Sequence, residues 1–128
     1  MKAPARRALP TRRVAVHRAL ATTRGHNGPT VSGCEEHGRS WRRGPAYIVV
    51  EQSPALTATE HDRCRPGLNH LAFHAGDRVE VDALVTAARA HGWTLLFPDR
   101  HPYAGGPDVY AAYLANTDGF EAELIASY

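Results

Sequence analysis

The sequence lacks long apolar runs and paired cysteines. No apolar stretch approaches the ~18 residues that a membrane span requires, and no basic start followed by an apolar segment and a cleavage site marks a secretory signal. The two cysteines, Cys34 and Cys64, stand far apart and form no CxxC pair. Their spacing excludes a zinc ribbon or disulfide scaffold and fits a reducing compartment. The 128 residues predict one domain with a modest core, in the cytoplasm and without a membrane partner.

Acidic residues are scarce in the first third of the chain. Residues 1–43 hold ten Lys and Arg against two acids, whereas residues 44–128 hold five Arg against eleven acids. A basic, acid-poor start is typical of an organelle transit peptide, a nucleic-acid-binding arm or an irregular tail. No aromatic residue lies among the arginines of residues 1–40 and no DNA-binding motif is present, so we expect no nucleic-acid partner. We expect residues 1–40 to form a disordered or irregular basic tail.

The first strand pattern covers Ala46–Gln52. It is rich in β-branched and aromatic residues and is bounded by Gly44-Pro45 and Ser53-Pro54. Alternation along a strand places Glu51 on the same face as Tyr47. A carboxylate that ends an apolar strand is either a solvated strand end or a ligand. Residues 53–66 then predict a polar segment that joins two structural units.

A second strand pattern, Leu68–His74, carries two histidines on one face. Alternation places His70 and His74 together and turns Leu71 and Phe73 toward the opposite face, where a helix would cover them. Histidines four residues apart along a strand are about 13 Å apart, so they cannot bind one metal together. At most one of the two is a direct metal ligand.

Residues 77–92 predict an amphipathic helix. Asp77 is a good N-cap and Glu80 completes a capping box, while Gly92 supplies a C-terminal stop. The apolar stripe that would pack on a sheet consists of Val81, Leu84, Val85 and Ala88.

The remaining residues predict three strands and a long loop. The strands are Trp93–Phe97, Val109–Ala115 and Phe120–Ile125, and an Asp-Gly turn at 116–119 joins the last two. The loop at 99–107 is rich in Gly and Pro, which is typical of either a pocket-lining loop or a plain flexible connection. The ionisable and aromatic residues in and beside this loop are candidate pocket groups, with surface or packing roles as the alternative: His101, Tyr103 and Tyr110.

Glu123 is the second candidate site residue. It lies in the middle of the last strand pattern, between apolar neighbours. Burying a carboxylate there costs several kcal/mol unless a cation or a donor meets it. If the last strand lies beside the strand of His70, the two side chains project into one concavity. Hard and borderline divalent metals favour such an oxygen-plus-imidazole set.

These residues resemble the vicinal oxygen chelate superfamily, which includes glyoxalases, bleomycin and fosfomycin resistance proteins and extradiol dioxygenases. Residues 67–73 resemble the opening strand of that family's second module, and residues 118–124 resemble its closing strand. The resemblance implies an α+β fold with a complete βαβββ module at 66–127. A remnant of the first module at 41–56 would precede it, within one domain at 41–128.

The resemblance also implies a metal site and a function. His70 and Glu123 would bind a divalent iron, manganese, zinc or nickel ion, Glu51 would be a third ligand, and Glu123 would double as the catalytic base. The metal would act as a Lewis acid on a small oxygenated substrate, as in a lyase, isomerase, transferase or dioxygenase. A set with one convincing histidine disfavours the dioxygenase.

The first module is incomplete upstream, which leaves alternatives open. Either the site is incomplete in a monomer, or a second copy supplies the missing half in a homodimer. Besides a metal-dependent enzyme, the sequence fits a metal-free small-molecule binder of the resistance type or an inactive truncated member.

Overall fold

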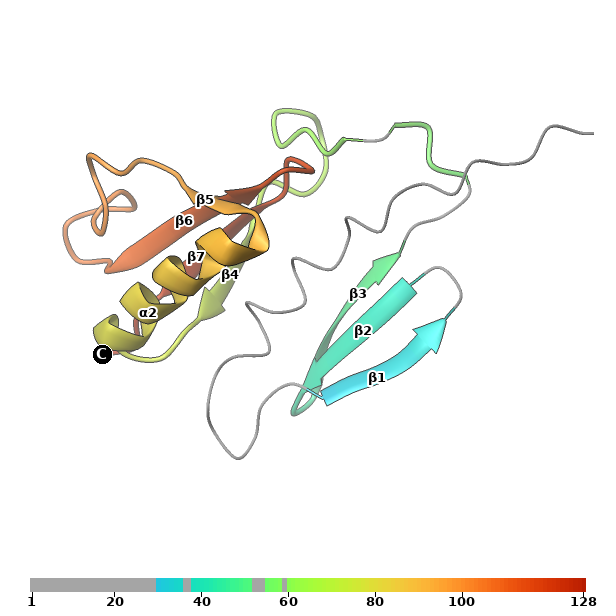
Figure 1. Cartoon of the computed structure of the whole chain (residues 1–128), viewed down its shortest axis with the longest axis horizontal. Helices are drawn as coiled ribbons and strands as arrows, with labels where there is room; N and C mark the ends of the chain where they lie inside the picture. Colours follow the sequence, from blue (N-terminus) through green and yellow to red (C-terminus); the bar gives the residue numbers. More distant parts are fainter. Residues whose placement is uncertain (1–29, 36–37, 52–54, 59) are drawn as a thin grey trace, which may run out of the picture.

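The computed structural model describes residues 30–35, 38–51, 55–58 and 60–128, which form two β-sheets and one α-helix (Figure 1). The first sheet has the order β1-β2-β3 and the second the order β4-β7-β6-β5. The strands of the first sheet are β1 (Thr30–Glu35), β2 (Gly38–Arg43) and β3 (Ala46–Glu51). The strands of the second are β4 (Leu71–His74), β5 (Trp93–Leu95), β6 (Ala111–Asn116) and β7 (Glu121–Ile125).

The three-stranded sheet corrects part of the sequence-based boundary at residue 40. The strand expected at 46–52 is present as β3, but β1 and β2 add two antiparallel strands at 30–35 and 38–43. Their pattern is hard to read because the register shifts around Gly33, which has no partner in β2. The partial first module therefore contains three strands rather than one. Residues 1–29 lie outside the described residues, so the expectation of an irregular tail over that range stays a prediction. Gln52, the expected last residue of the strand at 46–52, also lies outside them.

Residues 66–127 form the expected βαβββ module. β4 pairs with β7 in parallel, and the β5-β6 and β6-β7 pairs are antiparallel. The parallel pair needs a crossover, which α2 (Arg78–Ala88) supplies on one face of the sheet (Figure 1). The fold class is α+β, as predicted. We call the sheet surface opposite α2 the open face.

The helix begins where its capping signals place it. The Asp77 carboxylate accepts a hydrogen bond from the Glu80 backbone N–H at 2.9 Å, and the Glu80 carboxylate accepts one from the Asp77 N–H at 2.8 Å. This reciprocal capping box satisfies two of the free N–H groups at the helix start. A 3-10 turn, η1 (Arg89–His91), then leads to Gly92, whose φ of 80° ends the helical segment.

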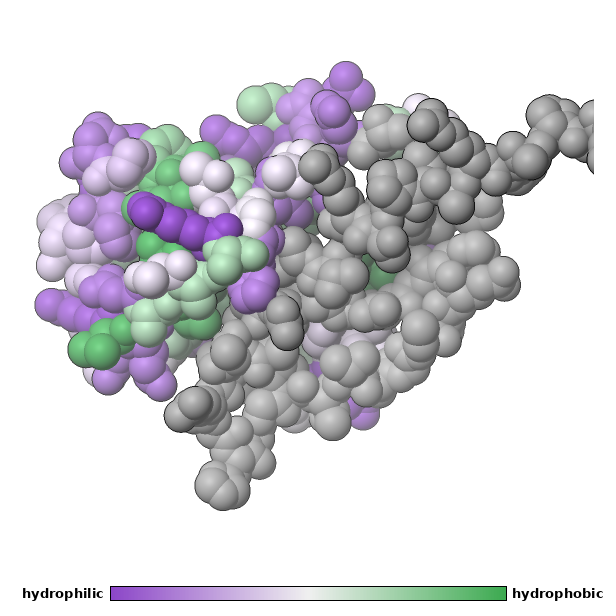
Figure 2. All heavy atoms as spheres, in the orientation of Figure 1, coloured by the Kyte–Doolittle hydropathy of each residue, from purple (hydrophilic) through white to green (hydrophobic). Residues whose placement is uncertain are grey.

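The hydrophobic core lies between α2 and the sheet. Val81, Val85 and Ala88 of the predicted stripe are buried, and Leu84 packs against them at the margin. The sheet residues in this core are Phe73, Trp93, Leu95, Ala112, Leu114, Ala122 and Leu124. Figure 2 shows apolar and polar residues interspersed over the visible surface of this module. Among the described residues, no helix is long and apolar enough to cross a membrane.

All four strands of the second sheet are shorter than their patterns, and the largest differences are in β4 and β5. β4 begins at Leu71 instead of Leu68, and β5 ends at Leu95 instead of Phe97. Phe97 has a φ of 52°, a left-handed conformation that a bulky residue adopts at a cost and that cannot continue a strand. Strained backbone of this kind is frequent beside binding sites, and Phe97 lines the cavity described below.

Candidate functional site

His70 and Glu123 meet on the open face of the four-stranded sheet. His70 Nε2 lies 3.3 Å from Glu123 Oε2. The contact follows from the parallel register, in which Leu71 pairs with Ala122 and Ala72 with Glu123. His70 immediately precedes β4, so its ring lies beside the carboxylate of the neighbouring strand. The predicted convergence of these two side chains is present, and their role as metal ligands stays a prediction.

Tyr113 binds the other oxygen of the same carboxylate. Its hydroxyl donates a hydrogen bond of 2.7 Å to Glu123 Oε1, because β6 places Tyr113 directly opposite Glu123. Glu123 is only 8% exposed, and a buried carboxylate is tolerated when its oxygens have partners. Burial, followed by the hydrogen bond and the charge of Glu123, raises the pKa of Tyr113 to about 12.

Asn69 orients the imidazole of His70. Asn69 Oδ1 lies 2.7 Å from His70 Nδ1, while Asn69 Nδ2 donates to the Arg63 carbonyl at 3.3 Å. The second bond assigns the amide orientation, so Nδ1 of His70 is the protonated nitrogen in the neutral ring. Nε2 then presents a lone pair to a carboxylate oxygen. In this tautomer two acceptors face each other, and either a proton on Nε2 or a metal cation between the two atoms stabilises the contact.

The donor pair suits a divalent metal in chemistry and spacing. Zinc bonds of 2.0–2.2 Å in a tetrahedral arrangement place two ligand atoms about 3.4 Å apart, close to the 3.3 Å between Nε2 and Oε2. Metal-binding histidines commonly donate their other N–H to an oxygen, as His70 does to Asn69. The pair therefore fits two positions of a coordination shell.

The described residues do not complete that shell. Within them, no group of three or more His, Cys, Asp or Glu side chains could hold a metal ion. Glu51, the expected third ligand, ends β3 in the other sheet with an exposed side chain, and it does not join the pair. His74 is exposed and pairs in register with Ile125, so it is His70 alone of the two histidines that contacts Glu123.

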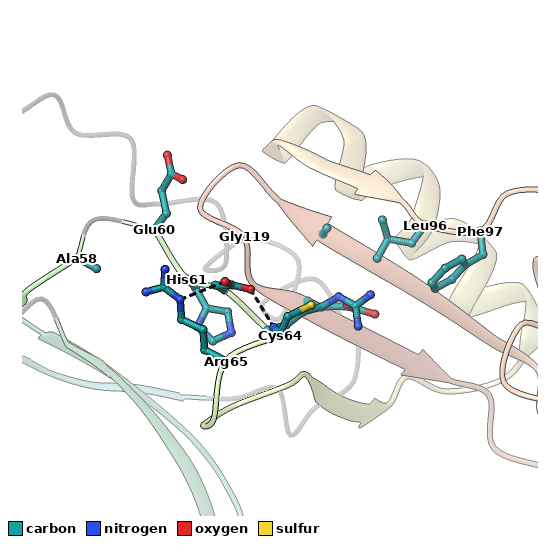
Figure 3. A pocket seen from close by; sticks show the side chains of 12 residues that line it. Ala58, Glu60, His61, Cys64, Arg65, Leu96, Phe97 and Gly119 are labelled. Carbon is teal, nitrogen blue, oxygen red and sulfur yellow. Dashed lines mark hydrogen bonds and ion pairs between the residues drawn. The ribbon is translucent and has the colours of Figure 1, made fainter.

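A cavity of about 730 Å³ lies against β7, and its lining includes Glu121 but neither His70 nor Glu123. Leu96 and Phe97 form part of one wall, and the segment of residues 60–65, which we call the connector, lines it from the other side (Figure 3). Glu121 also lines the cavity and shares the open face with Glu123 two residues further along β7. The cavity therefore reaches the strand that carries the site carboxylate.

Glu121 is a second buried carboxylate at this cavity. It is 7% exposed, and its Oε2 lies 3.1 Å from Nε of Arg63. The direction of this contact is poor for a hydrogen bond, so Oε2 has no hydrogen-bond partner among the described residues. The interaction is an ion pair, and it connects the connector to β7.

The connector is fastened to the turn between β6 and β7. The ring of His61 stacks on Phe120 at 4.5 Å, with 3° between the ring planes, and the His61 N–H donates to the Asp118 carbonyl at 3.0 Å. Gly119 permits this approach, because a Cβ there would collide with the carbonyl oxygen of His61. The position of the connector, which forms one wall of the cavity, therefore depends on the turn between β6 and β7.

The candidate pocket groups of the long loop lie mostly elsewhere. Tyr110 donates to both carboxylate oxygens of Asp82 on α2 at 2.9 Å and packs against the core. The rings of His101 and Tyr103 face Tyr110. Burial and the hydrogen bond to Asp82 raise the pKa of Tyr110. These contacts support the packing interpretation for all three residues.

Tyr113 is the site residue that the sequence did not reveal. The Asp-Gly signal located the turn but not its length. The observed hairpin has three loop residues, 117–119, closed by a hydrogen bond from the Asn116 N–H to the Phe120 carbonyl, with Gly119 at a φ of 84°. A three-residue loop ending in left-handed glycine is a common hairpin type. A three-residue loop at 117–119 places Tyr113 opposite Glu123, whereas the predicted turn at 116–119 does not.

Comparison with known proteins identifies the family. The model of the Glyoxalase/Bleomycin resistance protein/Dioxygenase superfamily matches residues 16–113. The chain therefore belongs to this superfamily, and the match extends well upstream of the region whose residues suggested it. The uncharacterized protein YqjT of Bacillus subtilis (strain 168) is 41% identical over 90 residues, which is 70% of each chain.

Solved structures share the fold. The crystal structure of a proposed glyoxalase from Bacillus halodurans is similar with a TM-score of 0.71 and 36% identity, over 78% of this chain and 76% of that one. A glyoxalase/bleomycin resistance protein from Albidiferax ferrireducens T118 has a TM-score of 0.62 and 18% identity, over 90% of this chain and 83% of that one.

Proposed function

We propose that this protein is a cytoplasmic, divalent-metal-dependent enzyme that acts on a small oxygenated molecule, with His70 and Glu123 as metal ligands. The observation that carries the proposal is the approach of His70 Nε2 to within 3.3 Å of the buried Glu123 Oε2. In the tautomer with the proton on Nδ1, toward Asn69, a metal cation between Nε2 and the carboxylate would satisfy both atoms. Iron, manganese, zinc and nickel accept this kind of ligand set.

A homodimer would complete the site. Catalytic zinc sites use three protein ligands, whereas the described pair supplies two. Apolar side chains are exposed on β3 and β4, each of which is an edge strand of its sheet. Tyr47 is 64% exposed, Val49 56% and Leu71 37%. Exposed apolar edge strands favour pairing with another chain. A second copy would then contribute the missing ligands, and the mass in solution would be twice 14.0 kDa.

The residues around the pair suit proton-transfer chemistry. A bound metal would supply Lewis-acid stabilisation of negative charge on substrate oxygens. Glu123 is the candidate catalytic base: its Oε2 would take a proton from the substrate and return it, while Oε1 stays bonded to Tyr113. The cavity beside β7 would admit the substrate, with Phe97 as an apolar wall. One histidine in the pair favours lyase or isomerase chemistry over a dioxygenase.

Metal analysis of variants tests this proposal. We expect purified protein to contain a divalent metal, and His70→Ala and Glu123→Ala each to lose it. His74→Ala is the matched control, because His74 is exposed on β4 and does not contact Glu123. A ligand that binds only the folded state raises its melting temperature, so Mn²⁺ or Zn²⁺ should raise Tm for the control but not for the two site variants. Equal metal content in all four proteins would refute the proposal.

A metal-free binding protein of the resistance type is the second candidate. A proton shared between His70 and Glu123 would also stabilise the pair, and the cavity with its Leu96 and Phe97 wall suits a small molecule. This candidate predicts no metal after purification and cooperative unfolding without one. An inactive truncated member predicts neither metal nor cooperative unfolding.

A further inference from the structure

We propose that Tyr113 is the positioning residue of this site: its hydroxyl fixes the Glu123 carboxylate so that Oε2 alone faces His70, and Gly105 leaves the space that this hydroxyl needs. The inference rests on the proposed function, since it concerns how the chain presents its two ligands to a cation. It concerns a residue and a loop that the predicted ligand pattern does not include.

The ring of Tyr113 is held on three sides. Its hydroxyl bonds Glu123 Oε1 at 2.7 Å. Its ring lies edge-on to that of His70, with centroids 6.2 Å apart, and edge-on to that of Phe97 at 6.0 Å. Tyr113 therefore contacts both members of the ligand pair and a residue of the cavity wall. A carboxylate with one oxygen occupied by a fixed donor has its second oxygen fixed as well.

Gly105 connects the long loop to the same hydroxyl. A Cβ built at Gly105 lies 2.6 Å from the Tyr113 hydroxyl oxygen, closer than side-chain carbons come. The φ of Gly105 lies outside the left-handed region, unlike that of Gly106 at 133°. Alanine at 105 is therefore compatible with the backbone and acts by displacing the hydroxyl. The loop at 99–107, for which the sequence left open a pocket-lining role or a plain connection, reaches the site through this contact.

A purely structural role for Tyr113 is the competing explanation, and Tyr110 provides the comparison. Tyr110 also donates to a carboxylate, that of Asp82, at 2.9 Å, but on α2 and away from the open face. Removing either hydroxyl deletes one tyrosine–carboxylate hydrogen bond. Only Tyr113→Phe releases a carboxylate that we propose as a metal ligand, that of Glu123. If Tyr113 has a purely structural role, Tyr113→Phe and Tyr110→Phe should therefore have equal effects on metal binding.

Co²⁺ titration of the full-length protein separates these explanations. The probe is Co²⁺ itself, followed by its visible absorption, with unfolding of each metal-free variant measured in parallel. We expect Tyr113→Phe to weaken Co²⁺ binding about 10- to 100-fold, the range for lost orienting partners, and to alter the absorption spectrum. Gly105→Ala should change both in the same direction, and Tyr110→Phe should match the wild type in both.

The outcomes are distinct. Wild-type affinity and spectrum in Tyr113→Phe would overturn this inference and leave the proposed metal site standing. No Co²⁺ binding by the wild-type protein would overturn both. If Tyr113→Phe does not fold, Gly105→Ala decides, because it keeps the tyrosine: weaker Co²⁺ binding supports the inference and unchanged binding overturns it.

Discussion

The amide oxygen of Asn69 lies 2.7 Å from Nδ1 of His70, and this contact determines which imidazole nitrogen faces Glu123. The amide is held the right way round by its second bond, from Nδ2 to the carbonyl of Arg63. The connector therefore helps to orient His70 through the backbone carbonyl of Arg63. The contact between His70 and Glu123 is thus part of a chain of four interacting residues: Arg63, Asn69, His70 and Glu123.

Removing the amide should weaken metal binding. We expect Asn69→Ala to lower the affinity for Zn²⁺ or Mn²⁺ about 10-fold or more, because the imidazole loses the acceptor that fixes its tautomer and orientation. Asn69→Asp keeps an acceptor at this position and should retain most of the affinity. Isothermal titration calorimetry measures both. Equal affinities for wild type and Asn69→Ala would show that the amide does not orient the ring.

The ion pair between Arg63 and Glu121 should contribute to stability. Arg63→Met leaves a carboxylate that is 7% exposed without its cation, and we expect a loss of about 1–3 kcal/mol in the free energy of unfolding. Adding Glu121→Gln removes the unpaired charge and should restore part of it. Arg65→Met is the control, because its pair with Asp62 is largely exposed and such pairs contribute about 0–1 kcal/mol. Urea unfolding of the four proteins tests this order.

The core beneath α2 offers a matched pair of valines. Val81 is fully buried, whereas Val79, two residues away on the same helix, is 75% exposed. We expect Val81→Ala to reduce the free energy of unfolding by about 2 kcal/mol, since it removes two methyl groups from a packed interface. Val79→Ala should change it by less than about 0.5 kcal/mol. Similar losses for the two variants would mean that the helix does not pack on this face.

Alkaline pH should destabilise the fold through Tyr113. Its pKa is about 12 in the folded state, above the ordinary 10.0, so folding favours the protonated phenol. This contribution is fully present below pH 10 and is lost as the pH rises from about 10 toward 12. The urea midpoint should fall as the pH is raised from about 10 to 11.5, and it should fall less in Tyr113→Phe. Tyr110, whose pKa is also raised, accounts for part of the remaining slope. An unchanged slope in Tyr113→Phe would contradict the assignment.

Local signals made the helix and the contact between His70 and Glu123 predictable. Asp77 and Glu80 are three residues apart, so their capping box is visible in the sequence. Alternation along a strand set the face of Glu123, and the order of elements in the module placed its strand beside that of His70. Each inference needed only short-range periodicity and one topology.

The first two strands and the contact of Tyr113 with Glu123 depend on non-local pairing, which the sequence does not show directly. β1 and β2 contain glycine and several polar or charged residues, and they are strands because each has a partner, with Trp41 of β2 opposite Ile48 of β3. Tyr113 meets Glu123 only in the register set by a three-residue turn, and a change of one loop residue would put a different side chain opposite. Ring contacts such as His61 on Phe120 join segments far apart in the chain and leave no periodic trace.

The contact of Gly119 with the carbonyl of His61 has a consequence for ligand size. Among the described residues the connector pairs with neither sheet edge, and its position depends on contacts such as the ring stack and hydrogen bond at the hairpin turn. Gly119 itself lines the cavity, so we expect a larger residue at this point to push the His61 carbonyl away from the turn and widen the entrance, and relatives with such a residue should accept bulkier molecules.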